Sequence, residues 1–294
     1  MKKFFLAVIA IMLAASVSAQ FYIYLSGGGV IKADSISLIA PSEQPTPSGD
    51  GMLSGEFSVS ATNKVHFSQG NLQYVGTWQF AENQWDCFGH VQYDDHRDLF
   101  GYGTGNMPNL VTTSDYDYST FVDWGVNPIT NGDNQAGLWR TLTKQEWVYI
   151  IYNRANASML FGLGAVNGMN GFILLPDNWV LPEGASFIPG TTLGLVDQGM
   201  NYLDYNNSYD HFADNTYSAE QWAVMESAGA VFLPAAGYNK ETGSYRIGEV
   251  GYYWSTTTEN ANYAYYICFE SYFFGPQYYG ARRHGRSVRL VRNM

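Results

Sequence analysis

The sequence predicts an α+β fold, in which two helices pack on twisted antiparallel sheets that are joined by long loops. Two capping boxes, Thr143 to Glu146 and Ser218 to Gln221, each precede residues with helical spacing. In such a box the first and fourth residues satisfy free N–H groups at the start of a helix. Short alternating apolar segments, densest between residues 230 and 291, indicate strands. Residues 86–134, rich in Gly, Asp, Asn and Tyr, are typical of long loops.

Three short segments precede the main domain. Residues 1–19 have the pattern of a signal peptide, with Lys2 and Lys3, an apolar stretch and the small residues before Gln20. Residues 20–40 predict a small β-hairpin around a glycine run, and residues 41–55 predict a Pro/Gly/Ser linker. We expect an exported protein that is periplasmic, on the cell surface or extracellular. The apolar stretch of the leader is shorter than the roughly 20 residues that span a bilayer, so a signal peptide is favoured over a membrane anchor. We expect no transmembrane segment in the mature chain, because no later segment is apolar enough to span.

The main domain, residues 56–294, should begin and end with strands. Phe57 to Phe80 is strand-like, the two capping boxes open the helices, and Ala230 to Pro234 reads as a buried strand. Three further strands are expected near the end of the chain, at Tyr252–Ser255, Tyr263–Glu270 and Ser287–Val291. The glycine runs at 101–105 and 162–164 are interpreted as turns, since neither follows a strand and opens a helix as a phosphate-binding loop does.

Composition and charge argue against several classes of protein. Charged residues make up only 14% of the chain and aromatic residues 16%, with 23 Tyr and 31 Gly. This composition favours a loop-rich extracellular β protein over a helical cytosolic enzyme. The formal net charge of -11 argues against nucleic acid as a partner, because phosphate binding needs a basic surface.

An ordered set of sequence blocks covers the chain from about residue 56 to the end. The blocks are Val65–Tyr74, Phe80–Trp85, Asp98–Thr104, Asp123–Gly125, Trp139–Trp147, Phe232–Tyr238, Tyr253–Thr256 and Arg282–Val291. They resemble the secreted paralogous domains of gut Bacteroidetes, the Fibrobacter-type major paralogous domain. That family is related in turn to formylglycine-generating enzymes and to the variable proteins of diversity-generating retroelements. The resemblance implies a C-type-lectin-like fold for residues 56–294, and it transfers no catalytic residue.

Residues that could carry catalysis or bind a metal form no complete site in the sequence. Cys87 and Cys268 could form a disulfide in an exported protein, or they could be two small buried hydrophobes. Asp94, Asp95 and Asp98 are weak candidates for a Ca²⁺ site, the alternative being a solvated acidic loop. The five His residues lack the spacing of zinc ligands, and no Gly-x-Ser-x-Gly motif is present. We therefore expect no catalytic residue and no cofactor other than the Ca²⁺ alternative.

The densest aromatic segment lies near the C-terminus and is the predicted binding site. Twelve of the 29 residues from Tyr252 to Gly280 are Tyr, Phe or Trp, and Tyr offers large, stiff contact area at low entropic cost. Trp254, Ile267 and Phe269 are expected in the core. Arg282 and Arg289 are expected to be buried or paired, and Arg286 to be exposed. The predicted ligand contacts, six of them partly exposed in a Gly-Pro-bearing loop, are Tyr272, Phe273, Phe274, Gln277, Tyr278, Tyr279, Arg283 and His284.

These observations predict an exported, non-enzymatic binding module that displays its C-terminal loop to a glycan or a protein at the cell surface. One alternative is a retroelement-diversified variable surface receptor of the same family. A second is an enzyme with a degenerate or metal-dependent site in the acidic loop 94–98. A third is an adhesive surface component that acts through its N-terminal hairpin.

Overall fold

The computed structural model describes residues 49–93, 95–190, 210–241 and 243–294, together with the backbone of four short strands outside these ranges. The chain divides into two compact units, Met1–Gln44 and Pro45–Met294. In the first unit, β1 (Phe21–Tyr24) and β2 (Val30–Ala33) pair antiparallel, which is the predicted hairpin. The predicted signal peptide and residues 41–48 of the predicted linker lie outside the described residues. Leu53 is buried and its N–H donates to Phe67 O at 2.9 Å, so the end of the predicted linker is part of the second unit.

The fold is β-rich, and the predicted α+β, C-type-lectin-like arrangement is wrong. Strand accounts for 36% of the structure and helix for 14%, and the strands form several small sheets. Both capping boxes are present, but α1 (Lys144–Val148) has only five residues and α2 (Ala219–Ser227) only nine. Helices this short cannot form a layer that covers a sheet, so most of the core is built by strands and loops packing on each other.

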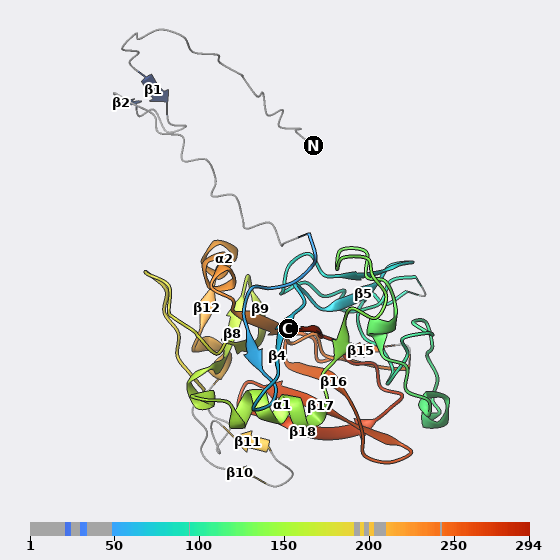
Figure 1. Ribbon diagram of the computed structural model, residues 1–294. Helices are drawn as coiled ribbons and strands as arrows, with labels where there is room; N and C mark the ends of the chain where they lie inside the picture. The colour runs from blue at the N-terminus through green and yellow to red at the C-terminus, as the bar shows by residue number, and fades with distance from the viewer. Residues whose placement is uncertain are drawn as a thin grey trace. The chain divides into compact units, whose positions relative to one another are not determined.

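Four-stranded and five-stranded sheets make up most of the second unit (Figure 1). One sheet has the order β3 (Phe57–Ser58), β4 (Lys64–Phe67), β19 (Leu290–Asn293) and β7 (Arg140–Thr141). A second has the order β12 (Thr216–Tyr217), β8 (Phe161–Val166), β9 (Met169–Leu174) and β13 (Val231–Pro234). The largest has the order β10 (Leu195–Val196), β11 (Met200–Tyr202), β18 (Phe273–Ala281), β17 (Tyr263–Glu270) and β16 (Val250–Thr258). Two hairpins complete the set, β5 (Leu72–Tyr74) with β6 (Trp78–Phe80) and β14 (Tyr238–Lys240) with β15 (Gly243–Tyr245).

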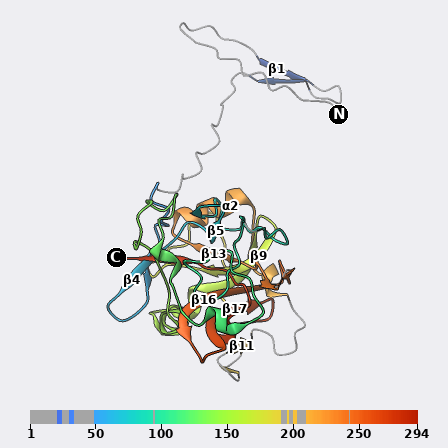
Figure 2. The same ribbon diagram turned by 90° about the vertical axis from the view of Figure 1, so that its right-hand side faces the viewer.

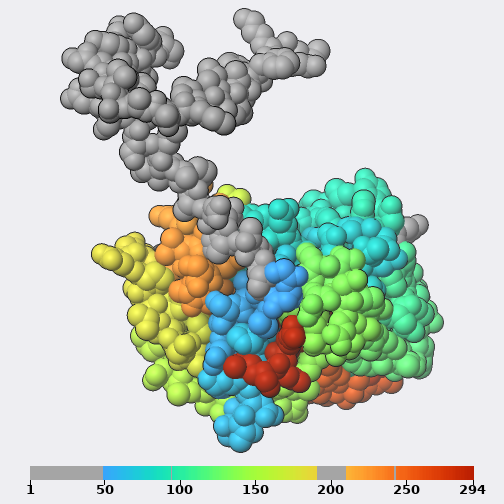
Figure 3. Space-filling view, turned by 45° about the horizontal axis from the view of Figure 1, so that its top comes forward, coloured from blue at the N-terminus to red at the C-terminus, as the bar shows by residue number. Residues whose placement is uncertain are grey.

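The C-terminal strand joins the two ends of the second unit. Because β19 lies between β4 and β7, the last residues, red in Figure 3, lie at the surface between the blue N-terminal strands and a green segment. The two helices are far from each other. Helix α1 packs against β17, and in Figures 1 and 2 α2 lies at the opposite end of the unit from β17. No helix of the described residues is long and apolar enough to cross a bilayer.

Irregular helical turns connect the strands. Helix α1 continues as a π-helix over Tyr149–Asn153 and then ends, and short 3₁₀ helices lie at Asp115–Tyr118, Trp124–Val126, Ala157–Met159 and His211–Ala213. In residues 86–93 and 95–134 the structure otherwise contains only isolated β-bridges, which agrees with the long loops that the composition predicts.

The predicted turn at residues 162–164 is also wrong, because Gly162 and Gly164 lie inside β8. A Cβ on Gly164 would lie 2.4 Å from the backbone oxygen of Asn215, so the close approach of the chain before β12 requires a glycine there. The turn lies further on, at Asn167 and Gly168, whose φ angles of 49° and 82° are those of a two-residue hairpin turn.

The β16–β17–β18 sheet is buried differently on its two faces. On one face Tyr253, Ile267 and Phe269 join the core cluster that contains Trp147 of α1. On the other face Trp254 packs with aromatic residues of the loop at 97–104. The predictions that Trp254, Ile267 and Phe269 belong to the core are confirmed, since each is at most 1% exposed.

Candidate functional site

The predicted C-terminal loop is largely a strand. Residues Phe273–Ala281 form β18, which pairs antiparallel with β17 along its length, and only Tyr272 lies in the preceding turn. The register shifts between the pairs Tyr266↔Tyr278 and Cys268↔Gly275, so β18 holds one extra residue at Pro276 and Gln277. A bulge accommodates the missing N–H of a proline, which explains why a Gly-Pro sequence does not break this strand.

The bulge decides which aromatic side chains of β18 reach solvent. Phe274 turns into the core, where it is fully buried and its ring lies 4.7 Å from that of Phe161, so the prediction that it is partly exposed is wrong. Because the extra residue changes the alternation, Tyr278 then lies opposite Tyr266 on the other face of the sheet. The predicted residues that remain half-buried at the surface are Tyr272, Phe273, Gln277, Tyr278, Tyr279, Arg283 and His284.

A row of tyrosine rings crosses five strands, β15, β14, β16, β17 and β18, on the face that carries Tyr278. Its members, which we call the tyrosine face, are Tyr238, Tyr245, Tyr252, Tyr266 and Tyr278. Successive ring centroids are 5.6 Å apart for Tyr245 and Tyr238, 5.8 Å for Tyr238 and Tyr252, 5.3 Å for Tyr252 and Tyr266, and 5.6 Å for Tyr266 and Tyr278. Tyr266 is buried, Tyr245 is 46% exposed, and the other three are half-buried. The spacings are those of favourable aromatic pairs, so the rings hold one another in place.

Arg286 lies beneath this row, which corrects the prediction that it is exposed. It is 4% exposed, and its guanidinium carbon is 4.1 Å from the ring centroid of Tyr266 and 4.3 Å from that of Trp254. Nη1 donates to Ala281 O at 2.9 Å. A Cβ on Gly280 would lie 2.7 Å from Nη2, so a glycine in β18 leaves room for the guanidinium. Arg282 and Arg289 are buried, as predicted.

His284 and Arg283 lie at the edge of the tyrosine face. The His284 ring is 6.0 Å from that of Tyr238, and the backbone of Gly285 exchanges two 2.8 Å hydrogen bonds with Asn239 of β14. Burial, followed by the charges of Arg286, Arg283 and Lys240, lowers the pKa of His284 to about 4, so the imidazole is neutral at neutral pH. Arg283 pairs with Asp115 at 2.5 Å.

An ion pair lies next to Tyr245 of the tyrosine face. Both Nη atoms of Arg246 donate to the carboxylate of Glu270 at 2.8 Å, and Nε donates to Glu249 at 3.1 Å. Glu270 is 6% exposed, and its bidentate contact raises the pKa of Arg246. The carboxylates of Glu270 and Asp115 are therefore already engaged by arginines.

The described residues of the acidic loop do not gather into a group that could hold a metal ion. Asp94 lies outside the described residues, Asp95 is exposed, and Asp98 is buried. The Asp98 carboxylate accepts hydrogen bonds from Phe88 N at 2.6 Å and from Gln92 Nε2 at 2.7 Å, so it anchors the loop. Burial raises the pKa of Asp98 to about 6. Among the described residues no group of three or more His, Cys, Asp or Glu side chains could hold a metal ion.

The two cysteines do not form a disulfide in the structure. Cys87 is half-buried and Cys268 is buried in β17. Burial, with the nearby charge of Asp98, raises the pKa of Cys87 to about 11, and burial raises that of Cys268 well above its usual range. Both thiols are therefore protonated at neutral pH, whereas a reactive thiol needs a lowered pKa.

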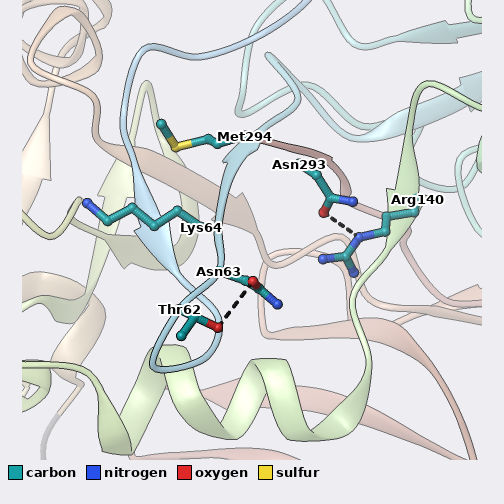
Figure 4. A pocket seen from close by; sticks show the side chains of 6 residues that line it. All are labelled: Thr62, Asn63, Lys64, Arg140, Asn293 and Met294. Atoms are coloured by element: carbon teal, nitrogen blue, oxygen red, sulfur yellow. Dashed lines mark hydrogen bonds between the residues drawn. The ribbon is translucent and has the colours of Figure 1, made fainter.

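A polar cavity of about 480 Å³ lies on a different part of the surface, next to β19 (Figure 4). Arg140 Nε donates to Asn293 Oδ1 at 2.8 Å, and its guanidinium is engaged by Glu146. The residues that line the cavity are Thr62, Asn63, Lys64, Arg140, Asn293 and Met294. None of these lining residues is an Asp, Glu, His or Cys.

Comparison with known proteins gives one family match. Residues 205–291 match a family model described as "Domain of unknown function (DUF8237)". The match includes all five members of the tyrosine face. No curated protein and no solved structure matches the chain.

Proposed function

We propose that this protein is an exported, non-enzymatic binding module, and that its tyrosine face contacts a glycan or a protein at the cell surface. The observation that supports this proposal is the row of Tyr rings across β15, β14, β16, β17 and β18. Tyr252, Tyr266 and Tyr278 sit on a sheet whose opposite face is buried in the core, and the β14–β15 hairpin adds Tyr238 and Tyr245 beside them. The rings therefore present stiff contact area that loses little entropy on binding.

The chemistry around the face favours binding over catalysis. The carboxylates of Glu270 and Asp115 are held by Arg246 and Arg283, and the thiol of Cys268 is buried and protonated. Tyr hydroxyls and ring faces remain, and they supply hydrogen bonds and apolar contact together. This combination suits sugar rings, which carry both apolar faces and hydroxyls, and also protein side chains.

The proposal is tested by replacing the two ends of the row. The double variant Tyr245→Ala, Tyr278→Ala removes the exposed ring of β15 and the half-buried ring of β18, which leaves the buried Tyr266 in place. Truncating a residue that dominates an interface costs about 2 kcal/mol or more, which corresponds to a Kd weakened about 30-fold. Ligands are found first by screening the wild-type protein on a glycan array and against cell-surface protein extracts.

Two matched variants complete the design. Tyr245→Phe, Tyr278→Phe keeps both rings, so it should retain most of the binding. Trp179→Ala removes a half-buried ring that packs against the core cluster around Trp222 of α2, and it should leave binding unchanged. Binding that survives the double Ala variant, or that is lost equally in Trp179→Ala, would contradict the proposal.

Export, and membership of the secreted paralogous family that the sequence blocks resemble, are part of the same proposal. Cleavage after residue 19 and recovery of the mature protein outside the cytoplasm, measured by N-terminal sequencing of cell fractions, would support it. An uncleaved cytoplasmic protein would contradict it.

A further inference from the structure

Positive charge is concentrated in the part of the chain that builds the tyrosine face. Residues 238–294 contain seven of the chain's 15 Lys and Arg residues but only four of its 26 Asp and Glu residues. The protein as a whole carries a formal net charge of -11. Of these seven cations, Arg246, Arg283 and Arg292 pair with carboxylates, and Arg282 and Arg289 are buried. Lys240 and Arg286 remain as the two to consider at the tyrosine face.

Lys240 is the cation best placed to meet a ligand. It lies two residues after Tyr238 in β14, on the same side of the strand, and it is exposed. Within the part of the chain that the structure describes, Lys240 forms no ion pair. The only carboxylate of this hairpin, Glu241, follows it in the two-residue turn between β14 and β15.

Arg286 adds charge from beneath. Its guanidinium donates to the backbone oxygens of Ala281 and His284, and among the described residues it pairs with no carboxylate. Ring faces of Tyr266 and Trp254 lie against it. Lys240 and Arg286 therefore place positive charge at the edge of the tyrosine face next to β14.

We propose that the ligand of the tyrosine face is an anionic polysaccharide whose sugar rings bear carboxylate groups, with sugar rings stacked on the tyrosines and carboxylates next to Lys240. This inference rests on the proposed function and narrows it to one class of ligand. Ring faces are electron-rich and repel anions, so carboxylates are excluded from the centre of the row and drawn to its β14 edge.

The test compares two polymers with the same backbone. Polygalacturonate carries a carboxylate on each sugar ring, and its methyl ester has the same rings without the charge. We expect polygalacturonate to bind about tenfold or more tightly than the ester, and its binding to weaken as salt is raised. Lys240→Gln should weaken its binding about fivefold or more, while Lys64→Gln, the same change beside the cavity at β19, should leave it unchanged. Melting temperatures of both variants check that the fold is intact.

The outcomes separate this inference from the proposed function. Equal binding of the two polymers, or no effect of Lys240→Gln, would overturn the anionic assignment. Selective binding of a sulfated polymer such as chondroitin sulfate, with no binding of polygalacturonate, would also overturn that assignment. In each case the proposed function still holds if a bound glycan is lost in Tyr245→Ala, Tyr278→Ala. If no polymer and no arrayed ligand depends on those tyrosines, both proposals fail.

Discussion

Replacing Phe274 with Ala should cost far more stability than replacing Tyr278 with Ala, although both rings belong to β18. Phe274 is fully buried, with its ring 4.7 Å from Phe161 and 5.6 Å from Phe172. Truncating a buried Phe costs about 3–5 kcal/mol of unfolding free energy. In a unit of this size each kcal/mol lowers Tm by about 2–4 °C, so we expect Phe274→Ala to lower Tm by about 6–20 °C.

Tyr278 should behave differently because it is half-buried at the surface, where its ring meets Tyr266 at 5.6 Å and Tyr279 at 6.2 Å. Such a ring pair is worth about 1 kcal/mol, so Tyr278→Ala should lower Tm by only about 2–4 °C. Scanning calorimetry of the two variants measures both values. Equal losses, or a larger loss for Tyr278→Ala, would refute the assignment of the bulge at Pro276 and Gln277.

Three further predictions concern Arg286, Asp98 and the two cysteines. Arg286→Met should destabilise the protein by about 2–4 kcal/mol, since it removes buried cation–π contacts and charged hydrogen bonds; urea unfolding in which Arg286→Met matches the wild type would count against this role. Because the pKa of Asp98 is raised from 3.8 to about 6, the folded state binds more protons than the unfolded state between these values. Its contribution of about 3 kcal/mol is therefore present near pH 4 and is lost as pH rises through 6. Relative to Asp98→Asn, the wild type should lose stability between pH 4 and 7, and a difference that does not change with pH would contradict this. Finally, a reductant should leave Tm unchanged because Cys87 and Cys268 are not bonded, whereas a disulfide would make Tm fall on reduction.

Local signals in the sequence identified many elements of this fold. The capping boxes at Thr143 and Ser218 mark both α-helices, since capping depends on side chains within one turn. The buried strand near Val231 and the strand Tyr263–Glu270 follow from their apolar patterns. The length of α1 was not predictable in the same way, because this helix turns into a π-helix after five residues. The fold class was therefore predicted wrongly even though the helix starts were right.

The candidate site was predicted in part. The aromatic segment near residue 278 does reach the surface, but Gly275 and Pro276 suggested a loop where the chain forms a bulged strand. The bulge, which a single sequence does not reveal, buries Phe274 and exposes Tyr278. Tyr238 and Tyr245 were missed because they come from a separate hairpin that reaches β16 only through the fold. Alternation along the strands would have placed Tyr252 and Trp254 on one face.

Oxidative footprinting of tyrosines, with and without the ligand found by screening, tests the central claim most directly. If the tyrosine face is the binding surface, then Tyr238, Tyr245 and Tyr278 should be protected in the complex. Tyr93 and Tyr116, which are 61% and 74% exposed and lie outside the row, should react equally in both states. Unchanged reactivity of the three face residues on a saturated complex would contradict the account.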